Sequence, residues 1–102
     1  MAMIALASAP ALAASPEADA ERTLRGCLTA GSSGAPRTSL EHAVIAVRAL
    51  CGPQIGDLRE IRVRRATAEL EGQAAEDAEK RTIRQLNDEI AYAVANLTGL
   101  HP

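Results

Sequence analysis

The stretch Cys27–Cys51, CLTAGSSGAPRTSLEHAVIAVRALC, decides the fold of this chain. It contains both cysteines of the sequence, a loop rich in glycine and serine, and an apolar segment that runs to its end. Apolar residues recur in that segment every three or four positions, as on one face of a helix: Leu40, Val44, Val47, Leu50 and Cys51. The stretch therefore predicts a helix over 39–51 that follows a turn.

A first helix is predicted before this turn, over residues 16–30. Ser15 can cap its start, Pro16 suits the first helical position, and Gly31 is expected to end it. Cys27 lies on the apolar face of this helix. The two predicted helices therefore form a hairpin.

The second helix of the hairpin has its own start and stop signals. Thr38 is predicted to cap it, and Glu41 is expected to reach back to the cap in a capping box. Gly52 and Pro53 then stop or kink the helix.

Cys27 and Cys51 are predicted to form a structural disulfide that closes the hairpin. Both lie on apolar faces that the hairpin brings together, and an even cysteine count in an exported chain favours pairing. The alternative is a pair of buried free thiols in a cytosolic protein. A redox role is not favoured: Cys51–Gln54 resembles the thioredoxin motif CGPC at three positions, but Gln54 replaces the second cysteine.

The rest of the chain predicts either one long helix over 54–98 or two helices over 54–71 and 74–98, with a break at Gly72. We favour two helices, because folding back lets the apolar residues of 83–97 meet the hairpin. Opposite charges four positions apart suit a solvated helix surface. The pairs are Glu60–Arg64, Arg65–Glu69, Glu76–Lys80, Asp77–Arg81 and Arg84–Asp88.

The predicted fold class is therefore all-α: a helical hairpin closed by a disulfide, followed by one long or two shorter helices. The chain has 102 residues, of which 47% are apolar, and this composition supports one small helical domain over 14–102. The net charge is −2 and Tyr92 is the only aromatic residue. Both features argue against nucleic-acid binding, which favours basic surfaces and stacking side chains.

Residues 1–13 are interpreted as the remnant of a signal peptide, because they are mostly apolar and uncharged and end in Ala11-Leu12-Ala13. The expected location is the periplasm or the cell exterior. If this segment is not a signal peptide, the location is the cytoplasm. No segment is long and apolar enough to predict an integral membrane span.

The sequence offers no catalytic constellation, so we expect a non-enzymatic protein without a cofactor. His42 and His101 lack the spacing of metal ligands, and no metal site is predicted.

Two surfaces are candidates for binding. The first is the apolar end of the last helix, a predicted contact with an unknown protein partner or in a homodimer: Ile90, Tyr92, Val94 and Leu97. The second is a basic cluster that could bind an anion or a lipid surface: Arg59, Arg62 and Arg65. The alternative is that these arginines pair with Asp57, Glu60 and Glu69 of the same predicted helix. The leading hypothesis is an exported protein-interaction or structural module. The alternatives are an anion- or lipid-surface-binding protein and a cytosolic regulator or phage-type structural protein.

Overall fold

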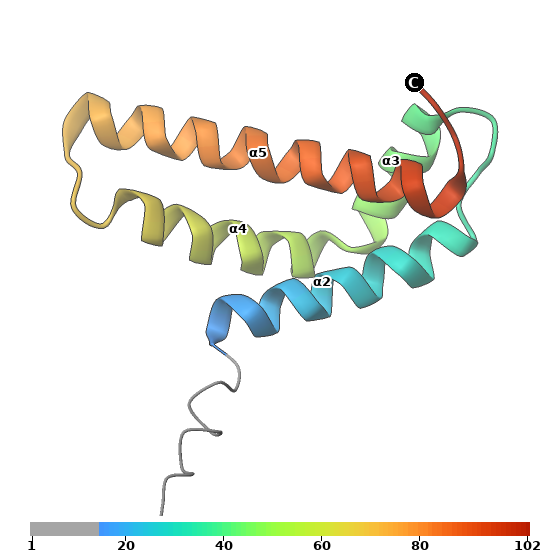
Figure 1. Ribbon diagram of the computed structural model, residues 1–102, viewed down its shortest axis with the longest axis horizontal. Coiled ribbons are helices and arrows are strands. Elements are labelled where there is room, and N and C mark those ends of the chain that lie inside the picture. Colours follow the sequence, from blue (N-terminus) through green and yellow to red (C-terminus); the bar gives the residue numbers. More distant parts are fainter. Residues whose placement is uncertain (1–14) are drawn as a thin grey trace, which may run out of the picture.

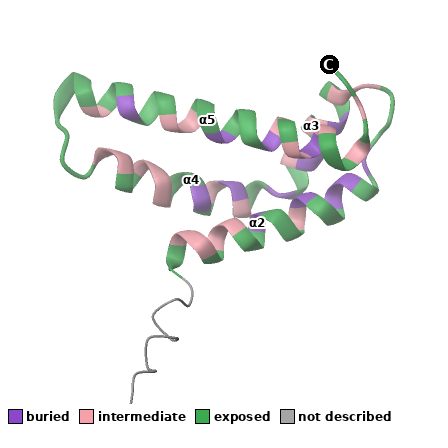
Figure 2. Cartoon of the chain, viewed as in Figure 1, coloured by how far each residue is buried: buried purple, intermediate pink, exposed green. Residues whose placement is uncertain are grey.

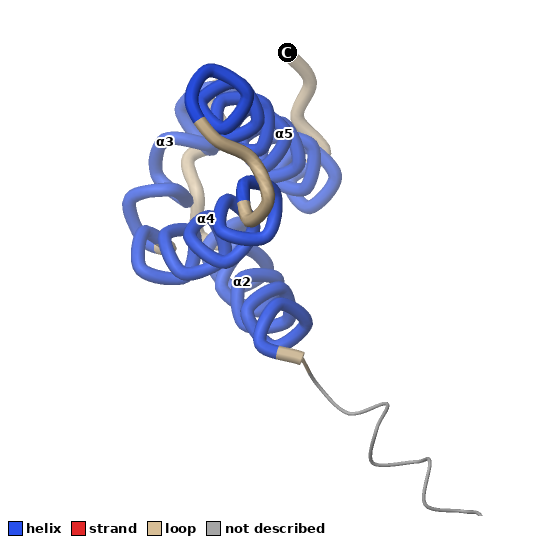
Figure 3. Tube along the Cα trace, turned by 90° about the vertical axis from the view of Figure 1, so that its left-hand side faces the viewer, coloured by secondary structure: helices blue, strands red, loops and turns tan. Residues whose placement is uncertain are grey.

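The computed structural model describes residues 15–102, and the predicted signal-peptide segment, residues 1–13, lies outside the described part. The described residues form four helices and no strand: α2 (Pro16–Ser33), α3 (Leu40–Leu50), α4 (Gly52–Thr67) and α5 (Gly72–Thr98). Helices α4 and α5 run antiparallel, side by side, while α2 packs against both of them (Figure 1, Figure 3). The short helix α3 leads into α4 and also packs against α2 and α5. The all-α prediction is confirmed.

Helix α2 begins where the sequence predicts. The Ser15 hydroxyl accepts a hydrogen bond of 3.0 Å from the backbone N–H of Ala18, which satisfies one of the unpaired donors at the helix start. Pro16 occupies the first turn, where its missing N–H costs nothing.

The predicted end of α2 at Gly31 is wrong, because the helix continues to Ser33 and is capped by Gly34. Gly31 is buried inside the helix, against α3. A Cβ atom at this position would lie 3.1 Å from Cδ2 of Leu50. The glycine therefore permits close approach of α2 and α3 and does not terminate the helix.

The start of α3 differs from the prediction by one residue. Ser39, not Thr38, is the cap, and its hydroxyl accepts a hydrogen bond of 3.1 Å from the N–H of His42. The Thr38 hydroxyl lies 2.9 Å from the Nδ1 atom of His42 instead. The predicted capping box with Glu41 is therefore not formed. Adjacent Thr and Ser can both cap, and the backbone conformation of Ser39 decides between them.

The two-helix alternative for the second half is confirmed. Helix α4 ends at Thr67, and α5 starts at Gly72, whose φ of +58° suits glycine far better than any residue with a Cβ. The predicted boundaries were shifted: α4 ends four residues earlier than expected and α5 starts two residues earlier. Gly99, with a φ of +78°, ends α5.

The core lies where all four helices meet, and Figure 2 shows its buried residues on their facing sides. It is formed by aliphatic side chains and one sulfur: Leu24, Leu28, Val47, Cys51, Ile55, Leu58, Leu86, Ile90 and Val94. The outer part of the α4–α5 hairpin extends beyond this base. Ala78 is the only buried residue of the segment 64–81, so this arm has little buried apolar surface to hold it together.

Candidate functional site

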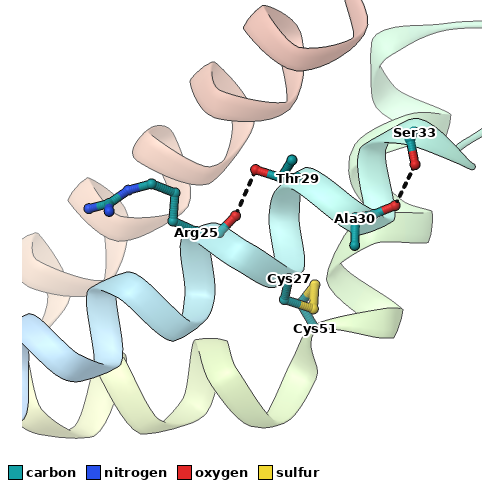
Figure 4. The surroundings of a disulfide bond; sticks show 6 residues. All are labelled: Arg25, Cys27, Thr29, Ala30, Ser33 and Cys51. Atoms are coloured by element: carbon teal, nitrogen blue, oxygen red, sulfur yellow. Dashed lines mark hydrogen bonds between the residues drawn. A yellow bond between two sulfur atoms is a disulfide. The ribbon is translucent and has the colours of Figure 1, made fainter.

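The two cysteines lie together at the junction of α2, α3 and α4 (Figure 4). Their Sγ atoms are 2.07 Å apart, at the bonding distance of a disulfide, and their Cα atoms are 5.9 Å apart. Cys51 is fully buried and Cys27 packs against the core. The pair therefore ties the middle of α2 to the bend between α3 and α4, as the predicted closed hairpin requires.

The predicted C-terminal partner surface is divided between the core and the surface. Ile90 and Val94 are 1% and 0% exposed, so they belong to the core and are not available to a partner. Tyr92 and Leu97 are exposed, at 72% and 43%. Of the four residues of the predicted contact, only Tyr92 and Leu97 are therefore exposed. The cause is that α2, α3 and α4 all pack against α5 and cover the face that carries Ile90 and Val94, while the adjacent face remains open.

An apolar groove lies on that open side, between α3 and α5. It consists of two adjoining cavities of about 560 and 450 Å³. The first is lined mainly by α3, and the second mainly by α5; both share Leu40, Ala91 and the tail residues His101 and Pro102. We call this surface the α3–α5 groove, and its apolar lining consists of Leu40, Val44, Ile45, Ala91, Tyr92, Ala95 and Leu100.

Ile45 and Tyr92 are the two large side chains of this groove that are most exposed. Ile45 is 58% exposed although it lies in an apolar helix, and Tyr92 is 72% exposed. The sequence contained one signal for this surface. The apolar residues of 40–51 spread beyond the single face that packing on a hairpin requires, and Ile45 lies in the excess.

Two carboxylates border the groove. Glu41 lines the first cavity and Asp88 lines the second, and no Lys or Arg lines either of them. Among residues 15–102 neither carboxylate forms an ion pair within 4 Å, although the sequence predicts a pair between Arg84 and Asp88. Glu41 and Asp88 therefore lack an ion-pair partner among the described residues, and His101 is the one basic side chain that lines both cavities.

The predicted basic cluster has a different role, centred on Arg62. Its guanidinium donates hydrogen bonds of 2.9 Å to Glu21 of α2 and of 2.9 Å to Glu89 of α5, and its Nε lies 3.5 Å from Glu17. Arg65 forms a second contact with Glu17, at 2.5 Å. The cluster therefore joins α4 to α2 and α5.

The surroundings of Arg62 stabilise the charged form of its guanidinium. Burial alone would lower the pKa of its guanidinium, but the hydrogen bonds and negative charges of Glu89 and Glu21 outweigh burial, and the pKa is raised above its usual value. The side chain of Arg62 is only 14% exposed, and its partners already occupy the positions that an external anion would take.

The arginines therefore do not form the predicted anion site. Arg62 and Arg65 bind carboxylates of the chain itself, and Arg59 is exposed without an ion pair among the described residues. The predicted neutralising partners lay on α4 itself. Among the described residues only Glu60–Arg64 is found, at 3.4 Å, since Arg62 and Arg65 reach carboxylates of the neighbouring helices.

Within residues 15–102, no group of three His, Cys, Asp or Glu side chains is placed to hold a metal ion. In the same part of the chain, each helix is too short or too polar to cross a membrane. A scan against protein-family models, a search of curated proteins and a search of solved structures each found no match.

Proposed function

We propose that this chain is an exported, non-enzymatic interaction module that binds a segment of another protein in the α3–α5 groove. The observation that carries the proposal is the pair of exposed apolar side chains, Ile45 and Tyr92, on a concave apolar surface. Contiguous exposed apolar surface on a small protein marks interaction sites more often than isolated exposed residues do. Tyrosine is also among the residues that dominate binding energy at interfaces.

Export to the periplasm or the cell exterior is part of the same proposal. It is supported by the signal-like composition of residues 1–13 and by the cysteine pair, since disulfides persist in oxidising compartments. A disulfide also suits a small domain whose aliphatic core needs an additional constraint.

The test uses Ile45→Asp, with Leu70→Asp as the matched control. Leu70 has a side chain of the same size as Ile45 and is also exposed, but it lies at the tip of the α4–α5 arm, away from the groove. A partner is first captured by the wild-type protein from extracts of the producing cells, identified, and purified. Calorimetric titration of this pure partner should show about thirtyfold weaker binding for Ile45→Asp and less than twofold change for Leu70→Asp.

Equal affinity of the wild type and Ile45→Asp for the pure partner would overturn the proposal. The alternative of a homodimer has its own result: sedimentation would show a wild-type dimer that Ile45→Asp converts to a monomer. In that case the groove would be an interface between copies of this chain, and the proposal of a different protein would fail.

A further inference from the structure

The shape of the α3–α5 groove indicates the kind of segment that it accepts. Ala91 and Ala95 are four positions apart on α5, so their small side chains form a low floor along the helix. Leu40 and Val44 extend this floor onto α3. A floor of small and aliphatic side chains between two helices is the kind of surface on which an amphipathic helix lays its apolar face.

The charge of the groove border indicates what the polar side of that segment carries. Glu41 and Asp88 face the solvent at the two cavities, and neither is neutralised by an ion pair among the described residues. The sequence assigns both to partners within their own helices, with Glu41 in a capping box and Asp88 beside Arg84, and the structure forms neither contact. Both carboxylates are therefore free to meet charges on a bound segment.

From this juxtaposition we propose that the occupant of the α3–α5 groove is a basic amphipathic helix of a protein partner. Its apolar face covers Ile45, Ala91 and Tyr92, and its Lys or Arg residues pair with Glu41 and Asp88. The inference rests on the proposed function and adds the chemistry of the partner. Complementary charge at the border fixes the orientation and selects against acidic segments.

The test uses two synthetic helical peptides of about 18 residues that share one leucine face. The polar face carries only lysine in the first peptide and only glutamate in the second. Fluorescence anisotropy should show that the wild type binds the lysine peptide about tenfold more tightly at low salt. The preference should shrink at about 0.5 M salt, where exposed charges are screened.

Two double variants separate charge at the groove from charge in general. Glu41→Gln with Asp88→Asn should weaken binding of the lysine peptide about fivefold and reduce its salt dependence. Glu76→Gln with Asp77→Asn removes the same charge from the arm and should change the affinity less than twofold. Thermal unfolding of all variants checks that each one folds.

The outcomes distinguish this inference from the proposed function. Equal binding of the two peptides, or equal effects of the two double variants, would overturn the basic helix; so would a failure of both peptides to bind. If Ile45→Asp still weakens binding of the natural partner about thirtyfold in those cases, the proposed function stands without this inference. If Ile45→Asp binds both the lysine peptide and the partner as the wild type does, both proposals fail.

Discussion

Reducing the Cys27–Cys51 disulfide is expected to lower the free energy of unfolding by about 3.5 kcal/mol. The bond closes a loop across a sequence separation of 24, and on the chain-entropy model this restricts the unfolded chain by that amount. The reduced thiols are expected to stay in the same apolar surroundings, because Cys51 is fully buried and Cys27 packs against the core. The loss therefore comes mainly from the unfolded state.

A loss of this size is large for such a small domain. Total stabilities are typically about 5–15 kcal/mol, and 1 kcal/mol shifts the melting temperature of a domain of this length by about 4–8 °C. We therefore expect the reduced protein to melt about 15–25 °C below the oxidised one. Urea unfolding followed by circular dichroism gives the free energies, and the intact mass reports the loss of two hydrogen atoms in the oxidised form.

The control is the double variant Cys27→Ala, Cys51→Ala, whose stability should not respond to reductant. A difference below about 1 kcal/mol between the oxidised and reduced wild type would refute the chain-entropy reasoning. It would mean that the packing around the junction, and not the cross-link, holds α2 to the bend between α3 and α4.

Three further predictions concern stability and are checked by urea unfolding. Arg62→Ala should cost about 2–3 kcal/mol, because it leaves Glu21 and Glu89 without a cation and breaks the link between three helices. Arg64→Ala removes only an exposed pair and should cost less than about 0.5 kcal/mol, so similar losses would contradict the joining role of Arg62. Gly72→Ala should cost about 1–2 kcal/mol because of its positive φ, and an unchanged stability would mean that the turn tolerates a Cβ. Ile90→Ala should cost about 2–5 kcal/mol and Tyr92→Ala less than about 0.5 kcal/mol; the reverse order would show that the core and the surface of α5 were assigned incorrectly.

Local signals in the sequence predicted the helices well, and their errors have local causes. Ser15 and Pro16 fixed the start of α2 because capping depends on a few adjacent residues. Gly72 indicated the break between α4 and α5. Gly31 failed as a stop signal because glycine also serves close helix packing, and only the position of Leu50 shows which role applies.

The candidate sites were harder to predict because they depend on residues distant in sequence. Arg62 is neutralised from α2 and α5, by residues 41 and 27 positions away, and no periodicity within α4 indicates these partners. The sequence therefore offered a basic cluster that is either free or neutralised within its own helix, whereas the structure has a link between helices. The apolar end of α5 was recognised, but its division into buried and open faces depends on how the other three helices pack against it.

Different faces of helix α5 contribute to the core and to the proposed binding groove. Ile90 and Val94 face the core, while Ala91 and Ala95 follow each of them by one residue and line the α3–α5 groove. One residue along a helix is a rotation of about 100°, so the two sets lie on adjacent faces of the same turns. A change at Ile90 or Val94 lowers the stability of the fold that forms the groove. A change at Tyr92 leaves the core intact, since this side chain contributes little buried surface. On α5, a substitution that weakens binding without lowering stability is therefore expected on the groove face. For this reason a substitution of Tyr92 tests binding more directly than one of the buried residues beside it.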